Sequence, residues 1–445
     1  MPKLFGTDGL RARAGEFPLN ESSVLTLGRA LSNLLLEKGL APKVVIGRDT
    51  RESGSWLEEC FTAGVVAGGG EVISAGIITT PAISYLTRTH GFSAGVVISA
   101  SHNPYYDNGI KIFSPSGTKI SESWEKELEE EILKARGEQK QPSKVPLRID
   151  PSLKQDYLNF LRGIYSAVNN HRLKLVIDCA HGASYELAPE LFRSLGFEVV
   201  AINNQPDGQN INLNCGSLHP EKLAKEVRSQ QADLGIAYDG DADRAIWVDE
   251  KGSILNGDHT LYLQAIQMKE KKELRRNAVV ATVMSNLGLE KILSDHGIKL
   301  FRTKVGDKYV LEEMIKQDIN LGGEQSGHTI FLDHSPAGDG LLTSLKMIEV
   351  RLERDQPFSE LVSNFQEFPQ ILINVQIKEK IPLEKIPGYF ETAEEIKSQL
   401  GNEGRLEVRY SGTEPVARIM IEGQDKNLIK KMAEKLAQVI KKGIG

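Results

Sequence analysis

The stretch Val96-Val-Ile-Ser-Ala-Ser-His-Asn-Pro104 joins an apolar run to a short polar loop that ends at a proline. The run is rich in β-branched residues and does not alternate with polar ones, which is typical of a parallel strand buried on both faces. The proline marks a turn and biases Asn103 away from helical angles. We therefore expect a buried strand that presents Ser101 and His102 at its carboxyl end, where open α/β sheets hold ligands. A serine in a turn more often bonds local backbone, so other loops must decide its role.

Strand-like and helix-like segments alternate along most of the chain. Val44–Asp49 reads as a buried strand between helical patterns at 22–38 and 54–68, and the same alternation restarts at Leu173 and at Ala278. This pattern predicts crossover units with mostly parallel strands. The last segment has alternating strands and an amphipathic helix from about residue 426. We expect three similar mixed-sheet α/β domains and a smaller C-terminal α+β domain, spanning 1–143, 144–250, 251–367 and 368–445.

Composition excludes several classes of protein. The 445 residues carry 54 Lys and Arg against 60 Asp and Glu, a net charge of −6, which gives no footprint for nucleic acid or an anionic membrane. No apolar stretch approaches the length of a membrane helix, and the N-terminus lacks the apolar region of a signal peptide. Three widely spaced cysteines are typical of reduced thiols. We expect a cytoplasmic protein that binds neither nucleic acid nor membrane.

The loop Asp239-Gly-Asp-Ala-Asp243 is the most informative stretch for chemistry. Three carboxylates spaced two apart by small residues can turn toward one hard cation. The spacing also matches the start of an EF-hand loop, but Arg244 occupies the position where that loop needs glycine, and strand-like segments flank it. Carboxylate repulsion makes a solvated acidic turn costly unless each carboxylate has its own partner. The loop therefore predicts a divalent-metal site.

Two further loops carry groups that suit a sugar phosphate. Arg409-Tyr-Ser-Gly-Thr413, with Arg418 on the following strand, can cradle a phosphate, although an ordinary hairpin turn has the same composition. Glu324-Gln-Ser326 suits sugar hydroxyls, or is simply a polar turn. Lys111 lies close in sequence to Ser101 and is a candidate for the same site. A nucleophile, a metal loop and a phosphate cradle together predict phosphoryl transfer on a sugar phosphate.

Five motifs in order resemble those of the α-D-phosphohexomutase family over essentially the whole chain. They are Phe5-Gly-Thr-Asp-Gly-Leu-Arg11, Ala100-Ser-His-Asn-Pro104, Asp239-Gly-Asp-Ala-Asp-Arg244, Gly323-Glu-Gln-Ser-Gly-His328 and Arg409-Tyr-Ser-Gly-Thr-Glu-Pro415. The resemblance implies four domains around a central cleft, with one loop from each.

The resemblance also implies a role for each matching residue. Ser101 would be a phosphoserine, and Asp239, Asp241 and Asp243 would hold one Mg²⁺ per chain together with an oxygen of that phosphoserine. Lys111 and Arg11 would serve proton transfer and the reacting phosphate, with His102 and Arg244 beside them. Glu324 and Ser326 would bind the sugar hydroxyls, and the non-reacting phosphate would contact Arg409, Ser411, Gly412, Thr413 and Arg418. His328, Arg244, Lys304 and Gly306 would also bind the substrate.

The substrate rests on fewer residues. Gln325 and the loop Arg302-Thr-Lys-Val-Gly-Asp307 resemble the glucosamine-specific members of the family. This implies interconversion of glucosamine 6-phosphate and glucosamine 1-phosphate through a bound glucosamine 1,6-bisphosphate, which also serves as activator, to supply amino-sugar nucleotide and cell-wall precursors. The alternatives are a phosphomannomutase/phosphoglucomutase with the same chemistry and a catalytically silent sugar-phosphate sensor. The expected partners are hexosamine phosphates, and a homodimer is the candidate assembly.

Overall fold

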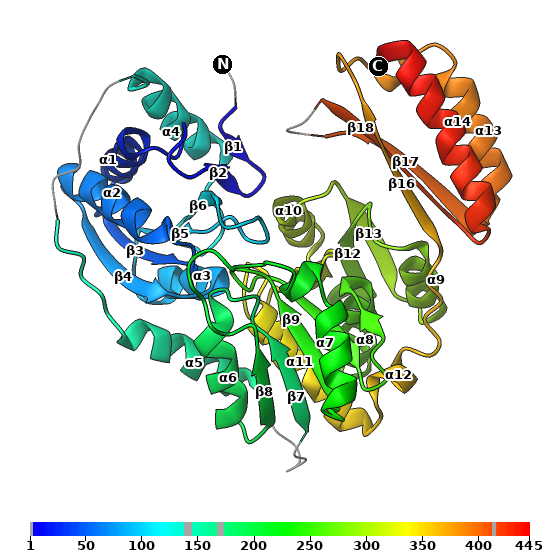
Figure 1. Cartoon of the computed structure of the whole chain (residues 1–445), viewed down its shortest axis with the longest axis horizontal. Helices are drawn as coiled ribbons and strands as arrows, with labels where there is room; N and C mark the ends of the chain where they lie inside the picture. Colours follow the sequence, from blue (N-terminus) through cyan, green and yellow to red (C-terminus); the bar gives the residue numbers. More distant parts are fainter. Residues whose placement is uncertain (1–2, 138–144, 167–172, 412–414) are drawn as a thin grey trace. The chain divides into compact units, whose positions relative to one another are not determined.

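The structure of the chain is a computed structural model, drawn in Figure 1. It describes residues 3–137, 145–166, 173–411 and 415–445. The chain forms two compact units, each discontinuous in sequence: a first unit of Met1–Thr282 with Phe301–Val362, and a second unit of Val283–Leu300 with Ser363–Gly445. Within the described ranges, no helix has both the length and the apolar character needed to cross a bilayer.

Six strands of the first unit form one sheet: β1 (Phe5–Gly6), β2 (Gly9–Arg13), β3 (Lys43–Arg48), β4 (Glu71–Ile77), β5 (Ala94–Ile98) and β6 (Asp107–Phe113). Their order is β1-β2-β6-β5-β3-β4. β3 is parallel to β4 and β5, whereas β6 is antiparallel to β5 and β2. The expectation of mostly parallel strands is wrong for this sheet, because the loop from β5 to β6 is too short for a crossover.

Four helices accompany this sheet: α1 (Glu21–Glu37), α2 (Gly54–Ala67), α3 (Thr80–Thr89) and α4 (Glu122–Lys134). α1 begins where the Asn20 side chain accepts the backbone N–H of Ser23. α1 and α2 pack so closely that a Cβ on Gly64 would lie 2.1 Å from the carbonyl oxygen of Leu25. Apolar side chains of α1, α2 and α4 join those of the strands in one core. All residues of β5 are buried, as the unalternating run predicts.

A second sheet of the first unit contains β7 (Lys174–Asp178), β8 (Glu198–Ile202), β9 (Leu234–Tyr238), β10 (Ala245–Asp249) and β11 (Ile254–Leu255), in the order β11-β10-β9-β7-β8. β7 is parallel to β8 and β9, while β9 and β10 form an antiparallel hairpin closed by the aspartate loop. The accompanying helices are α5 (Ser152–Ile164), α6 (Ser184–Ser194), α7 (Glu221–Ser229) and the short η1 (Gly216–Leu218).

The third sheet contains β12 (Ala278–Thr282), β13 (Lys299–Thr303), β14 (Leu321–Gly323) and β15 (Thr329–Phe331), in the order β13-β12-β14-β15. β12 and β14 are parallel, and β14 and β15 are antiparallel. The helices of this region are α8 (Gly257–Glu270), η2 (Arg275–Asn277), α10 (Asp307–Gln317), α11 (Gly340–Arg354) and α12 (Phe358–Leu361). All three larger sheets are therefore mixed, as expected.

The second unit has a three-stranded antiparallel sheet of β16 (Gln370–Gln376), β17 (Gly404–Tyr410) and β18 (Val416–Gly423), with β18 in the middle. α9 (Leu287–Asp295), η3 (Leu383–Lys385), α13 (Tyr389–Leu400), η4 (Gly401–Glu403) and α14 (Lys426–Ile444) complete it. Apolar residues of α13 and α14 pack with those of the sheet. The C-terminal α+β region is thus confirmed, whereas the four domain boundaries stay a prediction.

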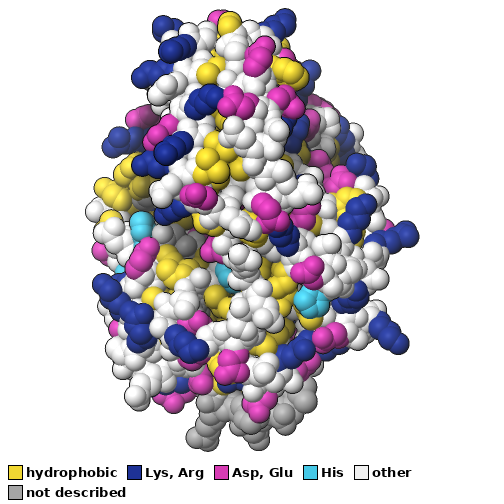
Figure 2. Space-filling view, turned by 90° about the vertical axis from the view of Figure 1, so that its right-hand side faces the viewer, with side chains coloured by type: hydrophobic (Ala, Val, Ile, Leu, Met, Phe, Trp, Pro, Cys, Tyr) yellow, Lys and Arg dark blue, Asp and Glu magenta, His cyan; other side chains and the backbone are white. Residues whose placement is uncertain are grey.

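The face of the molecule seen in Figure 2 mixes charges of both signs. Lys and Arg side chains are interspersed with Asp and Glu over this face. A strongly basic surface would be the signature of a nucleic-acid or anionic-membrane partner. Neither sign of charge dominates this face.

Candidate active site

Ser101 lies where β5 ends, in a left-handed backbone conformation with φ of 53°. Its side chain is buried, and its hydroxyl donates a hydrogen bond to Asp239 Oδ2 over 2.6 Å. The ring nitrogen Nδ1 of His102 lies 3.2 Å from the same hydroxyl oxygen. The structure therefore brings the sequence-predicted serine to the first aspartate of the predicted metal loop, 138 residues further along the chain.

Two side chains that the sequence analysis missed hold the serine loop in place. The guanidinium of Arg51 donates to the carbonyl oxygens of Ser101 and Asn103 at 3.1 and 2.5 Å. The amide nitrogen of Asn212 donates to the same two oxygens at 2.9 and 3.1 Å. A left-handed conformation is unfavourable for a residue with a side chain, so these bonds stabilise it. The polar residues that follow β3 could have indicated Arg51 from sequence. β3 is parallel to β5, and the carboxyl ends of parallel strands lie at the same edge of a sheet.

The three aspartates form a compact buried cluster. One carboxylate oxygen from each of Asp239, Asp241 and Asp243 lies within 4.8 Å of the other two, and each residue is at most 6 % exposed. Burial and the charges of Asp243 and Asp241 raise the pKa of Asp239 well above its usual range. The backbone of the aspartate loop lies close to that of Ser101 at Gly240: a Cβ on this glycine would lie 2.5 Å from the serine carbonyl oxygen.

The cluster fits a divalent cation. Thr80 donates its hydroxyl to Asp241, but Oδ1 of Asp241 and Oδ1 of Asp243 are buried and accept no hydrogen bond from any described residue. A buried carboxylate oxygen without a donor is costly, and hard oxygen ligands are those that Mg²⁺ prefers. Asp239, Asp241 and Asp243 are therefore the residues that would hold such an ion.

Lys111 supplies one of the positive charges that lie beside the cluster. It lies on β6, opposite Val97 of β5. Its Nζ is 2.8 Å from Asp241, 3.2 Å from Asp243 and 3.1 Å from Asp8. Burial works against the charge, but these three carboxylates outweigh burial and hold the pKa of Lys111 well above its usual range. Lys111 is thus charged, and is an acid rather than a base.

Asp8 connects the N-terminal loop to this cluster, and the sequence analysis missed it. It pairs with Arg11, whose guanidinium also donates to Asn103 Oδ1 at 3.3 Å. Although burial alone would raise the pKa of Asp8, Lys111, Lys119 and Arg11 hold it well below its usual range. Arg11 therefore lies beside the serine loop, as expected.

The predicted sugar loop joins the same site through the turn between β14 and β15. Nδ1 of His328 lies 3.6 Å from Asp243 Oδ1, and Asp243 outweighs burial to raise the pKa of His328 to about 9. The backbone N–H of Arg244 donates to Asp239 Oδ1 at 3.2 Å. Burial, Arg244 and Arg11 lower the pKa of His102 to about 4, so this imidazole is neutral. The site thus holds one charged and one neutral histidine.

Glu324 and Gly306 meet at the outer side of this site. The backbone N–H of Gly306 donates to Glu324 Oε1 at 3.1 Å. The side chain of Lys304 is exposed, and its Nζ lies 5.9 Å from the centre of the Tyr309 ring. Ser326 is half-buried in the turn that Glu324 opens. The predicted sugar-contacting residues therefore border one region of the first unit.

The predicted phosphate cradle belongs to the second unit. Arg409 of β17 lies directly opposite Arg418 of β18. Burial and the charge of Arg418 lower the pKa of Arg409. Ser411 is buried at the end of β17, and its backbone N–H donates to Val416. Two adjacent guanidinium groups suit an anion. Gly412 and Thr413 lie outside the described residues.

Comparison with known proteins places this site in a family. Four family descriptions match the chain in order: "Phosphoglucomutase/phosphomannomutase, alpha/beta/alpha" domains I (residues 2–139), II (155–252) and III (256–368), and the "C-terminal domain" (372–439). The chain belongs to the phosphoglucomutase/phosphomannomutase family. The resemblance seen in the motifs is confirmed at this level.

Relatives within the family match over their full length. The phosphoglucosamine mutases of Solibacter usitatus and Caldicellulosiruptor bescii are 45 % and 46 % identical to this chain, and each match covers 99 % of both proteins. That of Koribacter versatilis is 45 % identical, covering 100 % of this chain and 97 % of the relative. These matches therefore span nearly the whole of both proteins.

Solved structures of the family share the fold. A phosphoglucomutase/phosphomannomutase family protein from Burkholderia thailandensis has a TM-score of 0.83 at 24 % identity, covering 99 % of this chain and 97 % of its own. Aspergillus fumigatus N-acetylphosphoglucosamine mutase, solved with GlcNAc-6P and magnesium, has a TM-score of 0.69 at 17 % identity, covering 99 % and 96 %. At such identities the likeness concerns the fold alone.

Proposed function

We propose that this chain is a phosphosugar mutase, an isomerase that interconverts glucosamine 6-phosphate and glucosamine 1-phosphate. The observation that carries the proposal is the contact of the Ser101 hydroxyl with Asp239, in a buried cluster that also holds Lys111. Full-length relatives at about 45 % identity named phosphoglucosamine mutase support the choice of sugar. The product would feed the synthesis of amino-sugar nucleotides and cell-wall precursors.

In the proposed reaction, Ser101 carries a phosphoryl group before each cycle. The free hydroxyl of the sugar monophosphate attacks this phosphorus, so that a sugar O–P bond forms and the Ser101 Oγ–P bond breaks. Lys111, which is charged, donates a proton to the departing serine oxygen and takes up the proton of the sugar hydroxyl. The resulting glucosamine 1,6-bisphosphate turns end for end and returns its other phosphoryl group to Ser101. Atoms balance over the two transfers.

The proposed metal is one Mg²⁺, held by Asp239, Asp241 and Asp243 with an oxygen of phosphoserine 101. When bound, the ion would neutralise charge on the transferring phosphoryl group. Two buried carboxylate oxygens without hydrogen-bond donors among the described residues support this assignment. Arg11 would bind the reacting phosphate, because it reaches the serine loop at Asn103. His102 and Arg244 would border the reacting group, as their contacts with Ser101 and Asp239 favour.

The remaining predicted residues are assigned to substrate binding. Those of the first unit would contact the sugar: Glu324, Ser326, His328, Lys304 and Gly306. Those of the second unit would bind the non-reacting phosphate, an assignment supported by the paired guanidinium groups: Arg409, Ser411, Gly412, Thr413 and Arg418. We propose the cytoplasm as the location, because all three cysteines are buried free thiols. The homodimer stays a prediction.

A substrate panel tests the proposal. Turnover of glucosamine, glucose and mannose 6-phosphates is measured with Mg²⁺ and a 1,6-bisphosphate, for the wild type and for Ser101→Ala. We expect the highest kcat/KM with glucosamine 6-phosphate, no turnover by Ser101→Ala, and a phosphorylated Ser101 peptide by mass spectrometry in the wild type only. Wild-type turnover by Ser101→Ala would exclude the covalent route. A preference for mannose or glucose phosphate would replace glucosamine as the substrate. A wild type with neither turnover nor phosphate on Ser101 would revive the silent sensor.

A further inference from the structure

Lys119 forms a bridge between two carboxylates from distant parts of the first unit. It lies in the segment between β6 and α4. Its Nζ is 2.5 Å from Asp8 Oδ1, and it is 2.6 and 2.8 Å from the two carboxylate oxygens of Asp307. Asp8 precedes Lys119 by 111 residues, and Asp307 follows it by 188. One ammonium group therefore ties the N-terminal loop to the start of α10.

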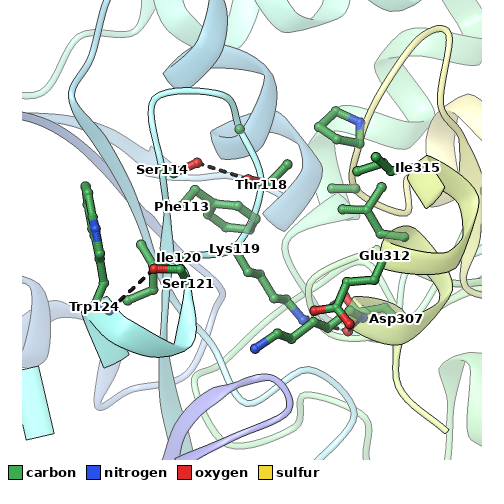
Figure 3. A pocket seen from close by; sticks show the side chains of 15 residues that line it. Phe113, Ser114, Thr118, Lys119, Ile120, Ser121, Trp124, Asp307, Glu312 and Ile315 are labelled. Atoms are coloured by element: carbon green, nitrogen blue, oxygen red, sulfur yellow. Dashed lines mark hydrogen bonds and ion pairs between the residues drawn. The ribbon is translucent and has the colours of Figure 1, made fainter. Parts of the chain in front are cut away.

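The bridge lies at one end of a cavity of about 400 Å³, which is shown in Figure 3. The side chain of Lys119 runs toward Asp307 in this view, among both apolar and polar side chains. Among the residues lining the cavity are Phe113, Ile120, Trp124, Leu311 and Ile315. Lys119 and Asp307 are only 16 % and 19 % exposed. Solvent ions screen a partly buried pair much less than an exposed one, so this bridge constrains its partners.

At the Asp307 end, the bridge fixes the segment that borders the sugar region. Asp307 is the first residue of α10 and directly follows Gly306, whose backbone N–H donates to Glu324. Nε2 of His328 lies 3.8 Å from Asp307 Oδ2. A displacement of Asp307 would therefore move a backbone donor and disturb the environment of two residues of the predicted sugar loop.

At the Asp8 end, the bridge reaches the phosphoryl-transfer region. Asp8 contacts Arg11 and Lys111 as well as Lys119. Among the residues that the structure describes, Lys119 forms no ion pair with any of the three metal-loop aspartates. Its ion pairs with described residues of the site are those with Asp8 and Asp307.

We infer that Lys119 is a positioning residue: by bridging Asp8 and Asp307, it holds the segment Lys304–Asp307 in the place where it contacts the sugar during phosphoryl transfer. The statement that this segment contacts a sugar rests on the proposed function, whereas the bridge itself does not. Loss of the bridge should loosen the segment and weaken substrate binding, while the chemistry at Ser101 retains its own groups.

A second lysine of α10 provides a matched control. Lys308 pairs with Glu122 at 3.3 Å, so it also links the start of α10 to the region of α4. Glu122 is 70 % exposed, however, and exposed pairs contribute little. A neutral methionine at position 308 removes a charge next to Asp307 and leaves the Lys119 bridge intact.

The test compares Lys119→Met, Lys119→Arg, Lys308→Met, Asp307→Asn and the double variant Lys119→Met/Asp307→Asn. Amide hydrogen exchange of residues 304–310 is measured without substrate, and kcat and KM with whichever hexose phosphate the wild type turns over best. We expect faster exchange in Lys119→Met and an increase in KM of about tenfold with kcat changed less than about threefold. Lys119→Arg should restore most of the affinity, because a guanidinium can span two carboxylates. Asp307→Asn should change exchange and KM as Lys119→Met does, and the changes in the double variant should be no larger than those in either single variant.

Several outcomes would overturn the inference. These are unchanged exchange and KM in Lys119→Met, an equal effect of Lys308→Met, additive losses in the double variant, or a fall in kcat alone. If Lys119→Met does not fold, Lys119→Gln and Asp307→Asn are judged by the same two measurements. A wild type without activity on any hexose phosphate would contradict the proposed function, whereas the exchange data would still decide whether Lys119 holds the segment.

Discussion

The ammonium group of Lys111 lies 2.8 Å from a carboxylate oxygen of Asp241, and both side chains are buried. Lys111 is therefore the countercharge of a carboxylate cluster that is also the proposed cation site. The relationship links the stability of the first unit to the ion, since removing one partner of a buried pair leaves the other charge uncompensated.

Replacement of Lys111 should make stability depend on metal. We expect Lys111→Met to lose about 3–5 kcal/mol of stability when divalent ions are chelated, and to recover much of it in excess Mg²⁺, because the ion supplies the missing positive charge. Thermal unfolding with EDTA and with MgCl₂ measures both. Lys134→Met, at an exposed pair with Glu131, is the control and should unfold like the wild type. A Lys111→Met protein as stable as the wild type in EDTA would contradict the electrostatic account.

Asn212 should matter for activity although it lies outside every predicted motif. Asn212→Ala removes two hydrogen bonds that hold the carbonyl oxygens of Ser101 and Asn103. Loss of the two hydrogen bonds should lower the free energy of unfolding by about 1–3 kcal/mol. A displaced serine should lower kcat by about tenfold or more. Steady-state kinetics and thermal unfolding measure these effects. Asn159→Ala, on the exposed surface of α5, should change neither, and an Asn212→Ala enzyme with wild-type kcat would show that Arg51 alone holds the loop.

The buried His259 predicts a loss of stability in mild acid. Burial lowers the pKa of His259 to about 4, and the residue belongs to the capping box that begins α8. A histidine whose folded pKa lies below its unfolded value of about 6.5 stabilises the fold while neutral, and this contribution disappears as the pH falls from about 6.5 toward 4.

Between pH 7 and pH 5, the titration of His259 should lower the free energy of unfolding by about 2 kcal/mol. In His259→Gln that part of the pH dependence should vanish, because glutamine also serves as the third residue of a capping box. Denaturant unfolding at the two pH values measures the difference. His219→Gln, at an exposed histidine, is the control. An identical pH dependence in His259→Gln and the wild type would rule out this titration.

Because the second unit carries two paired guanidinium groups, we expect phosphate to stabilise the folded protein. Arg409 and Arg418 lie opposite each other, and burial together with Arg418 lowers the pKa of Arg409. An anion between such groups relieves their repulsion. We expect millimolar phosphate to raise the unfolding temperature of the wild type more than equal ionic strength of chloride, and Arg409→Gln to abolish the difference. Lys430→Gln, exposed on α14, should retain it. An equal response to chloride would indicate general screening only.

The features that were predictable from sequence are those set by short stretches of chain. The aspartate loop is one: residues two apart on a single hairpin must lie close together, so the spacing alone predicts the cluster. β5 and β9 are others, because an unbroken apolar run of this length is typical of a buried strand. The five motifs also indicated the protein family, and the comparisons confirm this prediction.

The residues that were missed act across long separations. Arg51 reaches the serine loop from the end of β3, and Asn212 reaches it from the segment between β8 and η1. Lys119 meets Asp8 and Asp307 only after the first unit has folded. No local pattern encodes such meetings. The antiparallel β6 was also not predictable from alternation, because its direction depends on the length of one loop rather than on its own residues.

All three aspartates come from the one loop that closes the β9–β10 hairpin. The aspartates of the proposed ligand set are thus built into one supersecondary element, and the oxygen of phosphoserine 101 would be the ligand from another loop. If other loops move while the proposed bisphosphate reorients, the three aspartates would still lie together on this one hairpin loop. An ion bound there would stay with the protein from one half-reaction to the next, and the cost of capturing it would not recur with each turnover.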